Sequence, residues 1–468
     1  MGATTRWTRE LDMTTETRPT GSDWAHRARQ HLWMQNKQRD RLENPGELPV
    51  LERGDGVYLW DVDGKRYIDG LSGLWVTAVG HGRSELGDVA REQMANLAYA
   101  STFDFATPPA IALAEKIASI APKGMERVYF TNSGSESVEI ALKMARQYHY
   151  NRGDKNRYKI ISRIGSYHGQ TFGALSVNGA SYARRTPFEP LLPGTMQVPG
   201  INCYRCPYEK TYPECDVFCA RTIEDRILFE APETVAAIIA EPISIANSNQ
   251  VPYPEYWRIL RDICDRHGIL LIADEVINGY GRTGKWFGIE HYDVVPDLIT
   301  TAKGISSGYV PIGAVIAKES VADAFGGGTD EAFMSGLTFA SHPVSTAVAG
   351  ANLDIIEREG LVENSARMGG HLDTRFEALQ AKHRVIAEVR GIGLLWGIEI
   401  VKDRETKEQF APADEIGARL TGKLRERGLL TRAGNMIFVA PPLVINREEA
   451  DTVVDIIDEA LTEFEGEL

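Results

Sequence analysis

Short apolar runs alternate with amphipathic stretches through the middle of the chain. The runs have the length and composition of buried strands, and they lie at 127–130, 158–162, 235–242, 268–276 and 297–302. Residues 137–148 instead carry apolar side chains at helical spacing, and residues 254–267 predict a second helix that ends at Gly268. Apolar strands that alternate with helices predict an α/β fold whose mainly parallel sheet is covered on both faces.

The two ends of the chain have a different pattern. Near the start, a mildly amphipathic helix is expected from Trp24 to Gln38, and alternating residues around Asp63-Gly64 predict a hairpin. After about residue 340 the pattern predicts two helices, a strand pair, a further helix, a further strand and a terminal helix. We therefore expect a large domain at 61–340, a smaller α+β domain at 341–468 and an N-terminal segment, 1–60, that contributes to the smaller domain.

Composition and charge narrow the class of protein. The chain has 468 residues, 43% of them apolar, which suits a globular protein with more than one domain. The net charge of -14 argues against general binding to nucleic acid or to an anionic membrane, because both require clustered Lys and Arg. No apolar run approaches the roughly 20 residues of a membrane span. The N-terminus lacks the apolar core of a secretory signal, Met13 is an alternative start, and five cysteines do not suggest an oxidised scaffold, so we expect a cytoplasmic enzyme.

Polar residues follow several predicted strands, at the sheet edge where parallel sheets bind ligands. The stretch TNSGSES, residues 131–137, follows one strand and opens a helix. Its Ser133 and Glu136 have capping-box spacing, and its Gly134 permits a close approach to the backbone. Free N–H groups at this helix start suit an anion of phosphate size, although a plain helix cap explains the same residues.

Three other strand ends carry candidates. Glu241 follows VAAIIA, Asp274 follows GILLIA, and Tyr167 and His168 follow YKIIS. A carboxylate that leaves an apolar strand is costly without a donor or a cation beside it, although Asp274 alone is as well explained as a loop cap. An aromatic side chain such as Tyr167 is more often part of the packing than a platform for a ligand.

The stretch LITTAKGISSGYVPIG, residues 298–313, places Lys303 directly after an apolar strand. Alone, this lysine is best explained as a side chain that extends to solvent. The alternative is an amine of depressed pKa that forms a Schiff base. Pyridoxal 5'-phosphate (PLP) requires an anion site, an aromatic platform, a carboxylate and a lysine together, for its phosphate, ring, pyridine nitrogen and aldehyde. The combination of strand ends therefore favours a PLP enzyme.

One motif suggests a different class of protein. GYGRTG, residues 279–284, matches the G-x-G-x-x-G fingerprint of dinucleotide sites. That fingerprint requires a helix directly afterwards, and the following residues predict none because they include Gly288, several aromatic side chains and Pro296. A non-catalytic NAD-binding or metal-binding protein is the weaker hypothesis.

Three stretches resemble the class III aminotransferases, which are PLP enzymes of fold type I often called ω-transaminases: FTNSGSESVEIALKMAR, ADEVINGYGRTGKWFG and TTAKGISSGYVPIGAV. The similarity extends from GVYLWDVDGKRYIDGLSGLW to APPLVI. It implies that Lys303 forms the Schiff base and carries protons, that Asp274 pairs with the pyridinium nitrogen, and that the enzyme is a homodimer with shared active sites. The other implied cofactor contacts are Gly134 and Ser135 at the phosphate, Tyr167 and Val276 on the two ring faces, His168 and Glu241 beside the cofactor, and Thr338 at the phosphate of the neighbouring subunit.

The resemblance also implies a substrate class. Trp75 in LSGLW, together with Tyr167, matches the aromatic wall of amine:pyruvate members, and Arg432 falls where these members carry a mobile arginine. An arginine fork suits the carboxylate of pyruvate or of an amino acid, although Arg432 is otherwise an exposed charge at a strand end. We expect ping-pong transfer of an amino group from an amine or ω-amino acid to pyruvate. An aminomutase or decarboxylase of the same fold is the alternative, and Asp104 would favour a cationic donor if it enters the pocket.

A cysteine-rich insert lies within the large domain at 203–219. The stretch CYRCPYEKTYPECDVFC contains Cys203, Cys206, Cys215 and Cys219. Four thiolates at this spacing suit a structural zinc ion, although four thiols packed in a surface insertion are the simpler explanation. We therefore assign no metal site.

Overall fold

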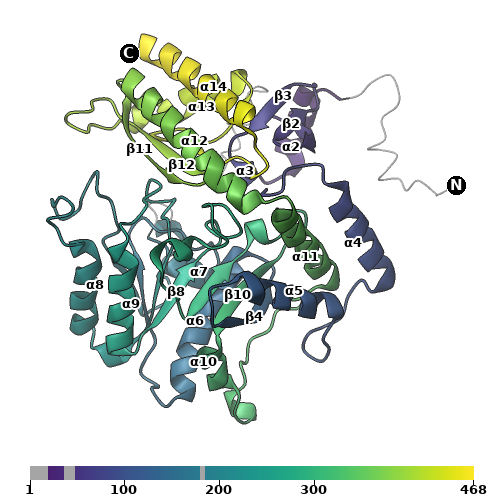
Figure 1. Cartoon of the computed structure of the whole chain (residues 1–468), viewed down its shortest axis with the longest axis vertical. Helices are drawn as coiled ribbons and strands as arrows, with labels where there is room; N and C mark the ends of the chain where they lie inside the picture. Colours follow the sequence, from purple (N-terminus) through teal and green to yellow (C-terminus); the bar gives the residue numbers. More distant parts are fainter. Residues whose placement is uncertain (1–18, 36–47, 180–184) are drawn as a thin grey trace.

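A seven-stranded sheet forms the centre of the larger lobe in the computed structural model (Figure 1). The structure describes residues 19–35, 48–179 and 185–468. The strand order is β4-β10-β9-β8-β7-β5-β6. Every neighbouring pair is parallel except the two pairs that β10 makes with β4 and β9. The strands are β4 (Met125–Thr131), β5 (Lys159–Arg163), β6 (Thr195–Val198), β7 (Val235–Ala240), β8 (Leu270–Asp274), β9 (Leu298–Thr301) and β10 (Gly313–Lys318).

The apolar strands are buried on both faces, as their composition predicts. In β8, Leu271 and Ala273 pack in the cluster that contains the residues of α8 and α9, whereas Leu270 and Ile272 pack in the cluster that contains those of α6. This alternation follows from the two-residue period of a strand. The helices of this lobe are α4 (Ser84–Asn96), α5 (Pro108–Ile120), α6 (Gly134–Asn151), α7 (Phe172–Ser176), α8 (Phe218–Phe229), α9 (Glu255–His267), α10 (Glu319–Ala322) and α11 (Pro343–Arg358).

The predicted strands and the two predicted helices of this lobe are present, with ends that move by up to a few residues. Helix α9 ends as expected at Gly268, whose left-handed backbone (φ of 62°) closes the last turn. Strand β10 was not predicted, because GAVIAK follows directly on a glycine-rich and proline-containing stretch that reads as a loop. The mainly parallel sheet is therefore confirmed, with one antiparallel strand inserted near its edge.

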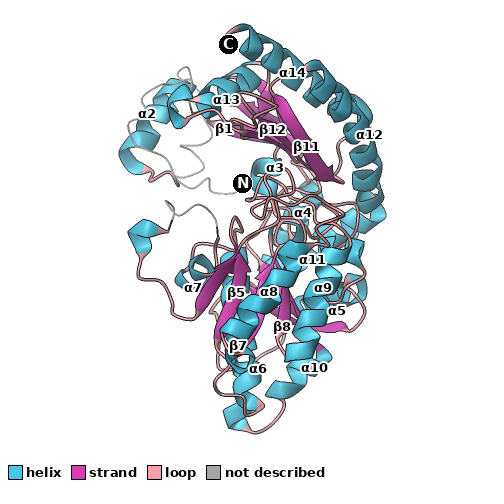
Figure 2. Ribbon diagram, turned by 90° about the vertical axis from the view of Figure 1, so that its left-hand side faces the viewer, coloured by secondary structure: helices cyan, strands magenta, loops and turns pink. Residues whose placement is uncertain are grey.

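The smaller lobe is an antiparallel sheet covered by helices (Figure 2). Its strand order is β11-β12-β14, and α12 packs on both β11 and α14. The elements after residue 340 follow the predicted order, but α11, the first of them, packs on α4 and α5 of the larger lobe. The elements of the smaller lobe are β11 (Ile386–Ile392), β12 (Leu395–Ile400), β14 (Met436–Val439), α12 (Leu361–Lys382), α13 (Ile416–Glu426) and α14 (Arg447–Gly466).

The N-terminal part pairs with a strand from the far end of the chain. Strands β2 (Tyr58–Asp61) and β3 (Arg66–Asp69) form the predicted hairpin, and β1 (Leu51–Asp55) adds to its other side. Strand β3 also pairs in parallel with β13 (Leu429–Leu430). The chain then enters the short helix α3 (Ser72–Trp75), so the hairpin brings this helix beside the C-terminal segment.

The first predicted helix is shorter than expected. Helix α2 (Gly21–His31) begins at a capping box formed by Thr20 and Asp23. Past its end, Leu32 and Trp33 are exposed, so no core supports a continuation of the apolar face. Residues 36–38 of the predicted helix, and Met13, lie outside the described residues.

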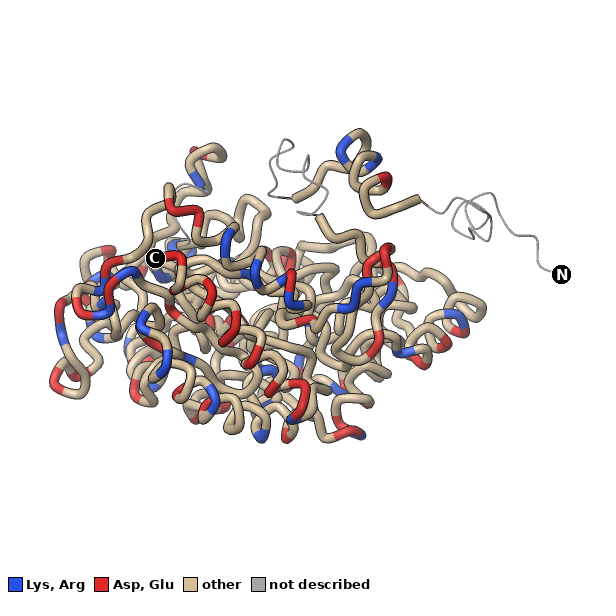
Figure 3. The backbone as a smooth tube through the Cα atoms, turned by 90° about the horizontal axis from the view of Figure 1, so that it is seen from above, with Lys and Arg blue, Asp and Glu red and all other residues tan. Residues whose placement is uncertain are grey.

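Charged residues of both signs are interspersed over the described backbone (Figure 3). No described helix combines the length and the apolar character that crossing a bilayer requires.

Candidate active site

The predicted site residues follow strands that end at one edge of the large sheet. Asp274 pairs with Thr300, which places the carboxyl ends of β8 and β9 side by side. Strand β10 connects that edge to the end of β4, because Gly313 pairs with Thr131 and Ala314 pairs with Thr301. The structure therefore assembles these strand ends where open parallel sheets bind ligands.

Asp274 is a buried carboxylate surrounded by donors. The imidazole of His168 donates from Nδ1 to Asp274 Oδ2 at 2.6 Å. The Thr300 hydroxyl donates to Oδ1 at 3.1 Å, and the Val276 N–H donates to the same oxygen at 3.1 Å. Three donors therefore surround a carboxylate that is 3% exposed, and these hydrogen bonds compensate the cost of burying it.

Lys303 has an environment that disfavours its charged form. Burial lowers its pKa to about 8, and the cations Arg432 and Arg282 act in the same direction, whereas Asp274 opposes them. The residue has a left-handed backbone, with a φ of 49°, which is uncommon for a side chain other than glycine. A strained backbone that carries an amine of depressed pKa is typical of a functional position.

An aromatic wall lies beside this lysine. The Nζ atom of Lys303 is 5.7 Å from the ring centroid of Trp75, and the guanidinium carbon of Arg432 is 5.8 Å from it. The edge of Phe438, on β14, meets the same indole at a centroid distance of 5.5 Å. Trp75 is buried, whereas Arg432 is exposed, so the arginine stands at the solvent side of this group. Sequence reasoning missed Phe438, which reads as an ordinary strand residue in MIFVA.

The start of α6 combines a helix cap with a close backbone contact. Ser133 accepts a hydrogen bond from the Glu136 N–H at 3.2 Å, as predicted. The Glu136 carboxylate returns to the N–H of Asn132 at 2.7 Å, one residue before the position that a standard capping box uses. A Cβ atom on Gly134 would lie 2.9 Å from Cγ1 of Val276, so glycine is needed for the two segments to meet here. Gly134, Val276 and the end of β8 are thus brought together.

Ser135 and the first turn of α6 are tied to neighbouring segments. The Ser135 hydroxyl accepts a hydrogen bond from the Gln170 N–H at 3.1 Å, in the turn that follows Tyr167 and His168. Ser137 donates to the Thr301 carbonyl at 2.9 Å, at the end of β9. The helix start, the turn after β5 and the strand that precedes Lys303 therefore form one connected structure.

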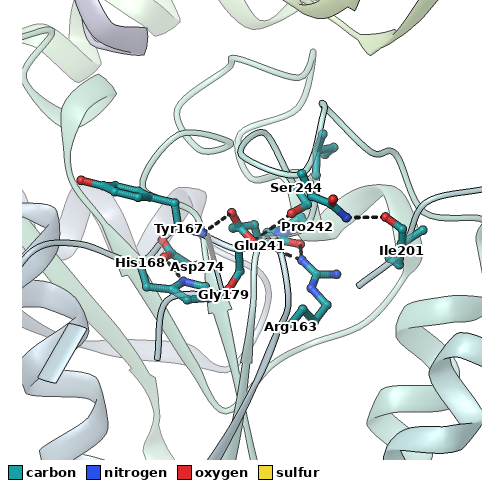
Figure 4. A network of polar contacts seen from close by, with 12 residues as sticks. Arg163, Tyr167, His168, Gly179, Ile201, Glu241, Pro242, Ser244 and Asp274 are labelled. Carbon is teal, nitrogen blue, oxygen red and sulfur yellow. Dashed lines mark hydrogen bonds and ion pairs between the residues drawn. The ribbon is translucent and has the colours of Figure 1, made fainter. Parts of the chain in front are cut away.

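Tyr167 is held by Glu241 (Figure 4). The backbone N–H of Tyr167 donates to Glu241 Oε1 at 3.2 Å, while its side chain is 36% exposed. Glu241 also receives the buried guanidinium of Arg163, whose Nη2 lies 3.3 Å from Oε2. Arg163 was not among the predicted residues, although an arginine that ends the apolar strand YKIIS was a visible signal.

Two further candidates lie apart from this group. Thr338 is exposed, and its carbonyl accepts a hydrogen bond from the Tyr99 hydroxyl at 2.8 Å. Asp104 is exposed in the turn at 101–105, and among the described residues it has no hydrogen bond or ion pair with Lys303 or Arg432. A role for either residue is not supported by the contacts within one chain.

The GYGRTG stretch is a connecting loop, with turns at 279–284 and no regular helix directly after them. Its Arg282 is buried and donates to the carbonyls of Leu394 and Pro441, at 3.0 and 2.6 Å, and to the Ser72 hydroxyl at 3.0 Å. Burial lowers the pKa of Arg282 to about 10. Arg282 therefore joins the larger lobe to the smaller lobe and to α3, the short helix that contains Trp75. No pattern in the sequence indicated this role, because the partners of Arg282 lie far away along the chain.

The cysteine-rich insert has thiols close enough to affect one another. Burial, reinforced by the neighbouring thiols, raises the pKa of Cys203 to about 11 and that of Cys219 to about 12. Within residues 19–35, 48–179 and 185–468, no group of three or more His, Cys, Asp or Glu side chains is arranged to hold a metal ion. The described structure therefore gives no support to a zinc site.

Comparisons with known proteins identify what the chain is similar to. The sequence model of the family described as aminotransferase class-III matches residues 43–461. A taurine–pyruvate aminotransferase of Bilophila wadsworthia is 38% identical over 431 residues, which cover 90% of this chain and 93% of the relative. A putrescine–pyruvate aminotransferase of Pseudomonas aeruginosa is 36% identical over 421 residues, which cover 88% and 90%. Among solved structures, a thermostable (S)-enantioselective ω-transaminase from Thermomicrobium roseum matches with a TM-score of 0.91 and 39% identity, over 96% of this chain and 99% of that one.

Proposed function

We propose that this chain, which belongs to the class III aminotransferase family, transfers an amino group from an amine or ω-amino acid to pyruvate. Family membership confirms the resemblance found in the sequence, the fold class and the aminotransferase activity. The NAD-binding hypothesis and the non-catalytic alternative are wrong. Pyruvate as the acceptor and the class of donor are the proposed part, and the grouping of Lys303, Trp75 and Arg432 carries them.

The cofactor of this family is PLP, and the described residues fit it. PLP supplies an aldehyde and an electron-accepting ring when it is bound. The start of α6, at the half-buried Gly134 and Ser135, suits the phosphate because backbone N–H groups and the helix dipole favour an anion. Asp274, with its three donors, suits a protonated ring nitrogen, and Tyr167 and Val276 would lie on the two ring faces.

Lys303 is assigned the proton transfers. Because its pKa is about 8, Lys303 is a neutral amine in about half of the molecules at pH 8, and the neutral amine can act as a nucleophile and as a base. The Asp274 carboxylate accepts hydrogen bonds from His168 and Thr300, which fix its position. Burial is the largest cause of the depressed pKa of Lys303, and the cations Arg432 and Arg282 favour the neutral amine in addition.

Arg432 is assigned to the acceptor. Its guanidinium lies at the open side of the indole of Trp75, and a guanidinium fork binds a carboxylate with two parallel hydrogen bonds. An exposed arginine can also turn into solvent, which leaves the aromatic wall to an uncharged donor. One pocket can then accept a keto acid in one half of the ping-pong cycle and an amine in the other.

The donor class is proposed as a small primary amine or ω-amino acid. Two relatives are named for taurine and for putrescine as donors, and this chain has similar identity to both. We also propose that two copies of the chain form a homodimer with shared active sites. The exposed Phe103, Phe105 and Phe339, the last beside Thr338, support this proposal, because such side chains favour burial against a second subunit.

A donor screen tests the proposal. Purified enzyme with PLP and pyruvate is incubated with taurine, β-alanine, putrescine and an arylalkylamine, and alanine is measured. We expect alanine with at least one donor and none from Lys303→Ala. Formation of CO2 without a requirement for pyruvate would instead indicate a decarboxylase.

A further inference from the structure

A buried ion pair lies directly behind Tyr167. Arg163 ends β5 and Glu241 follows β7, and these two strands are neighbours in the sheet. Arg163 Nη2 is 2.6 Å from the Glu241 carbonyl oxygen and 3.3 Å from the carboxylate. Both residues are at most 5% exposed, and no other described carboxylate forms a salt bridge with Arg163. Glu241 is therefore the carboxylate that compensates the buried charge of Arg163, whose guanidinium carbon also lies 5.7 Å from the centroid of the Tyr256 ring.

Glu241 connects the ion pair to the turn that carries Tyr167 through a hydrogen bond. Its Oε1 accepts the Tyr167 N–H at 3.2 Å, and its Oε2 accepts the Ser244 hydroxyl at 3.2 Å (Figure 4). Within the part of the chain that the structure describes, the Tyr167 side chain itself has no hydrogen bond. The position of this ring is therefore set by its backbone, and the backbone is fixed by the acceptor on Glu241.

The next residue in the turn is fixed independently. The His168 N–H donates to Asn178 Oδ1 at 2.5 Å, and the imidazole is bonded to Asp274. Loss of the Glu241 contact would thus release Tyr167 on one side while His168 stays in place. A displacement confined to the aromatic platform is the expected consequence.

We propose that Arg163 is a positioning residue, which pairs with the Glu241 carboxylate and so holds Tyr167 against the ring of bound PLP. This inference rests on the proposed function, because the stacking of Tyr167 on PLP is part of it. Arg163 does not need to touch the cofactor. It acts through the carboxylate and through one backbone hydrogen bond.

Three variants test the proposal through PLP affinity rather than through activity. PLP is titrated into the apo forms of Arg163→Met, Arg163→Lys and Glu241→Gln, and the visible circular dichroism of the bound cofactor is recorded. We expect Arg163→Met to raise the PLP dissociation constant by about tenfold or more, or about 1.4 kcal/mol, and to reduce the dichroism per bound cofactor. Arg163→Lys keeps the charge and should recover part of both signals.

The double variant separates positioning from a general loss of stability. In Arg163→Met the unpaired carboxylate is the source of the defect, so adding Glu241→Gln should restore part of the PLP affinity. Arg261→Met is the matched control, because Arg261 also forms a half-buried ion pair, with Asp297 at 2.8 Å, near the amino ends of β8 and β9. It should lower stability and leave PLP affinity and turnover unchanged.

Wild-type PLP affinity and dichroism in Arg163→Met would overturn the inference while leaving the proposed function intact. Failure of the unmodified chain to bind PLP would overturn both. If Arg163→Met does not fold, Glu241→Gln and Arg163→Lys decide the matter by the same titration. Equal losses in Arg261→Met and in the Arg163 variants would also contradict the proposal.

Discussion

Replacement of Arg432 by leucine should separate the two half-reactions. The side chain would lose its charge-assisted hydrogen bonds to the acceptor carboxylate, which are worth about 1.5–3 kcal/mol. Because Arg432 is exposed, water screens the interaction and the lower end applies, so kcat/KM for pyruvate should fall by about tenfold. For a donor without a carboxylate, kcat/KM should stay unchanged. Removal of this cation also raises the pKa of Lys303, so the rising limb of the pH profile should move to higher pH.

Steady-state kinetics with both substrates varied measure the two values independently. Arg432→Lys should be intermediate, because an ammonium keeps the charge and loses the fork. Arg427→Leu is the control, since Arg427 pairs with the half-exposed Glu463 on α14 and does not belong to the group formed by Trp75, Lys303 and Arg432. An equal loss of kcat/KM for both substrates, or no loss for pyruvate, would refute the assignment of Arg432 to the acceptor.

Three further outcomes follow from the site. The rate of PLP capture by the apoenzyme, followed by visible absorbance, should rise with pH, be half-maximal near pH 8 and level off at higher pH, because only the neutral amine of Lys303 reacts. A flat profile from pH 6 to 9 would contradict this. Asp274→Asn should lower kcat by on the order of a hundredfold, the scale found when one preorganised group is lost, while His168→Gln should have a smaller effect in the same assay. Arg282→Met leaves three buried acceptors without their donor, so the free energy of unfolding in urea should fall by about 3 kcal/mol or more, and a loss as small as that of an exposed pair would count against the role of Arg282.

Features that depend on local pattern could be read from the sequence. The strands were visible as apolar runs, and the position of Asp274 and Lys303 at the ends of neighbouring runs followed from the rule for parallel sheets. Helix ends marked by glycine, such as that at Gly268, were also predicted. In each case the relevant information lies within about ten residues.

Features that depend on distant partners could not be read in this way. Arg163 meets Glu241 across 78 positions, and Arg282 meets Pro441 across 159. An isolated arginine in the sequence gives no sign of which carbonyl or carboxylate it will reach. The pairing of β13 with β3 could not be predicted for the same reason, and a strand of two residues is too short to leave a pattern in the sequence.

The most direct test of the central claim is to find the lysine that binds the cofactor. Enzyme loaded with PLP is reduced with borohydride, which fixes the lysine–PLP imine as a stable amine, and is then digested and mapped by mass spectrometry. We expect one modified peptide, with the PLP group on Lys303, and no modification in Lys303→Ala. Attachment to another lysine, or no attachment in enzyme that forms alanine from pyruvate, would contradict it.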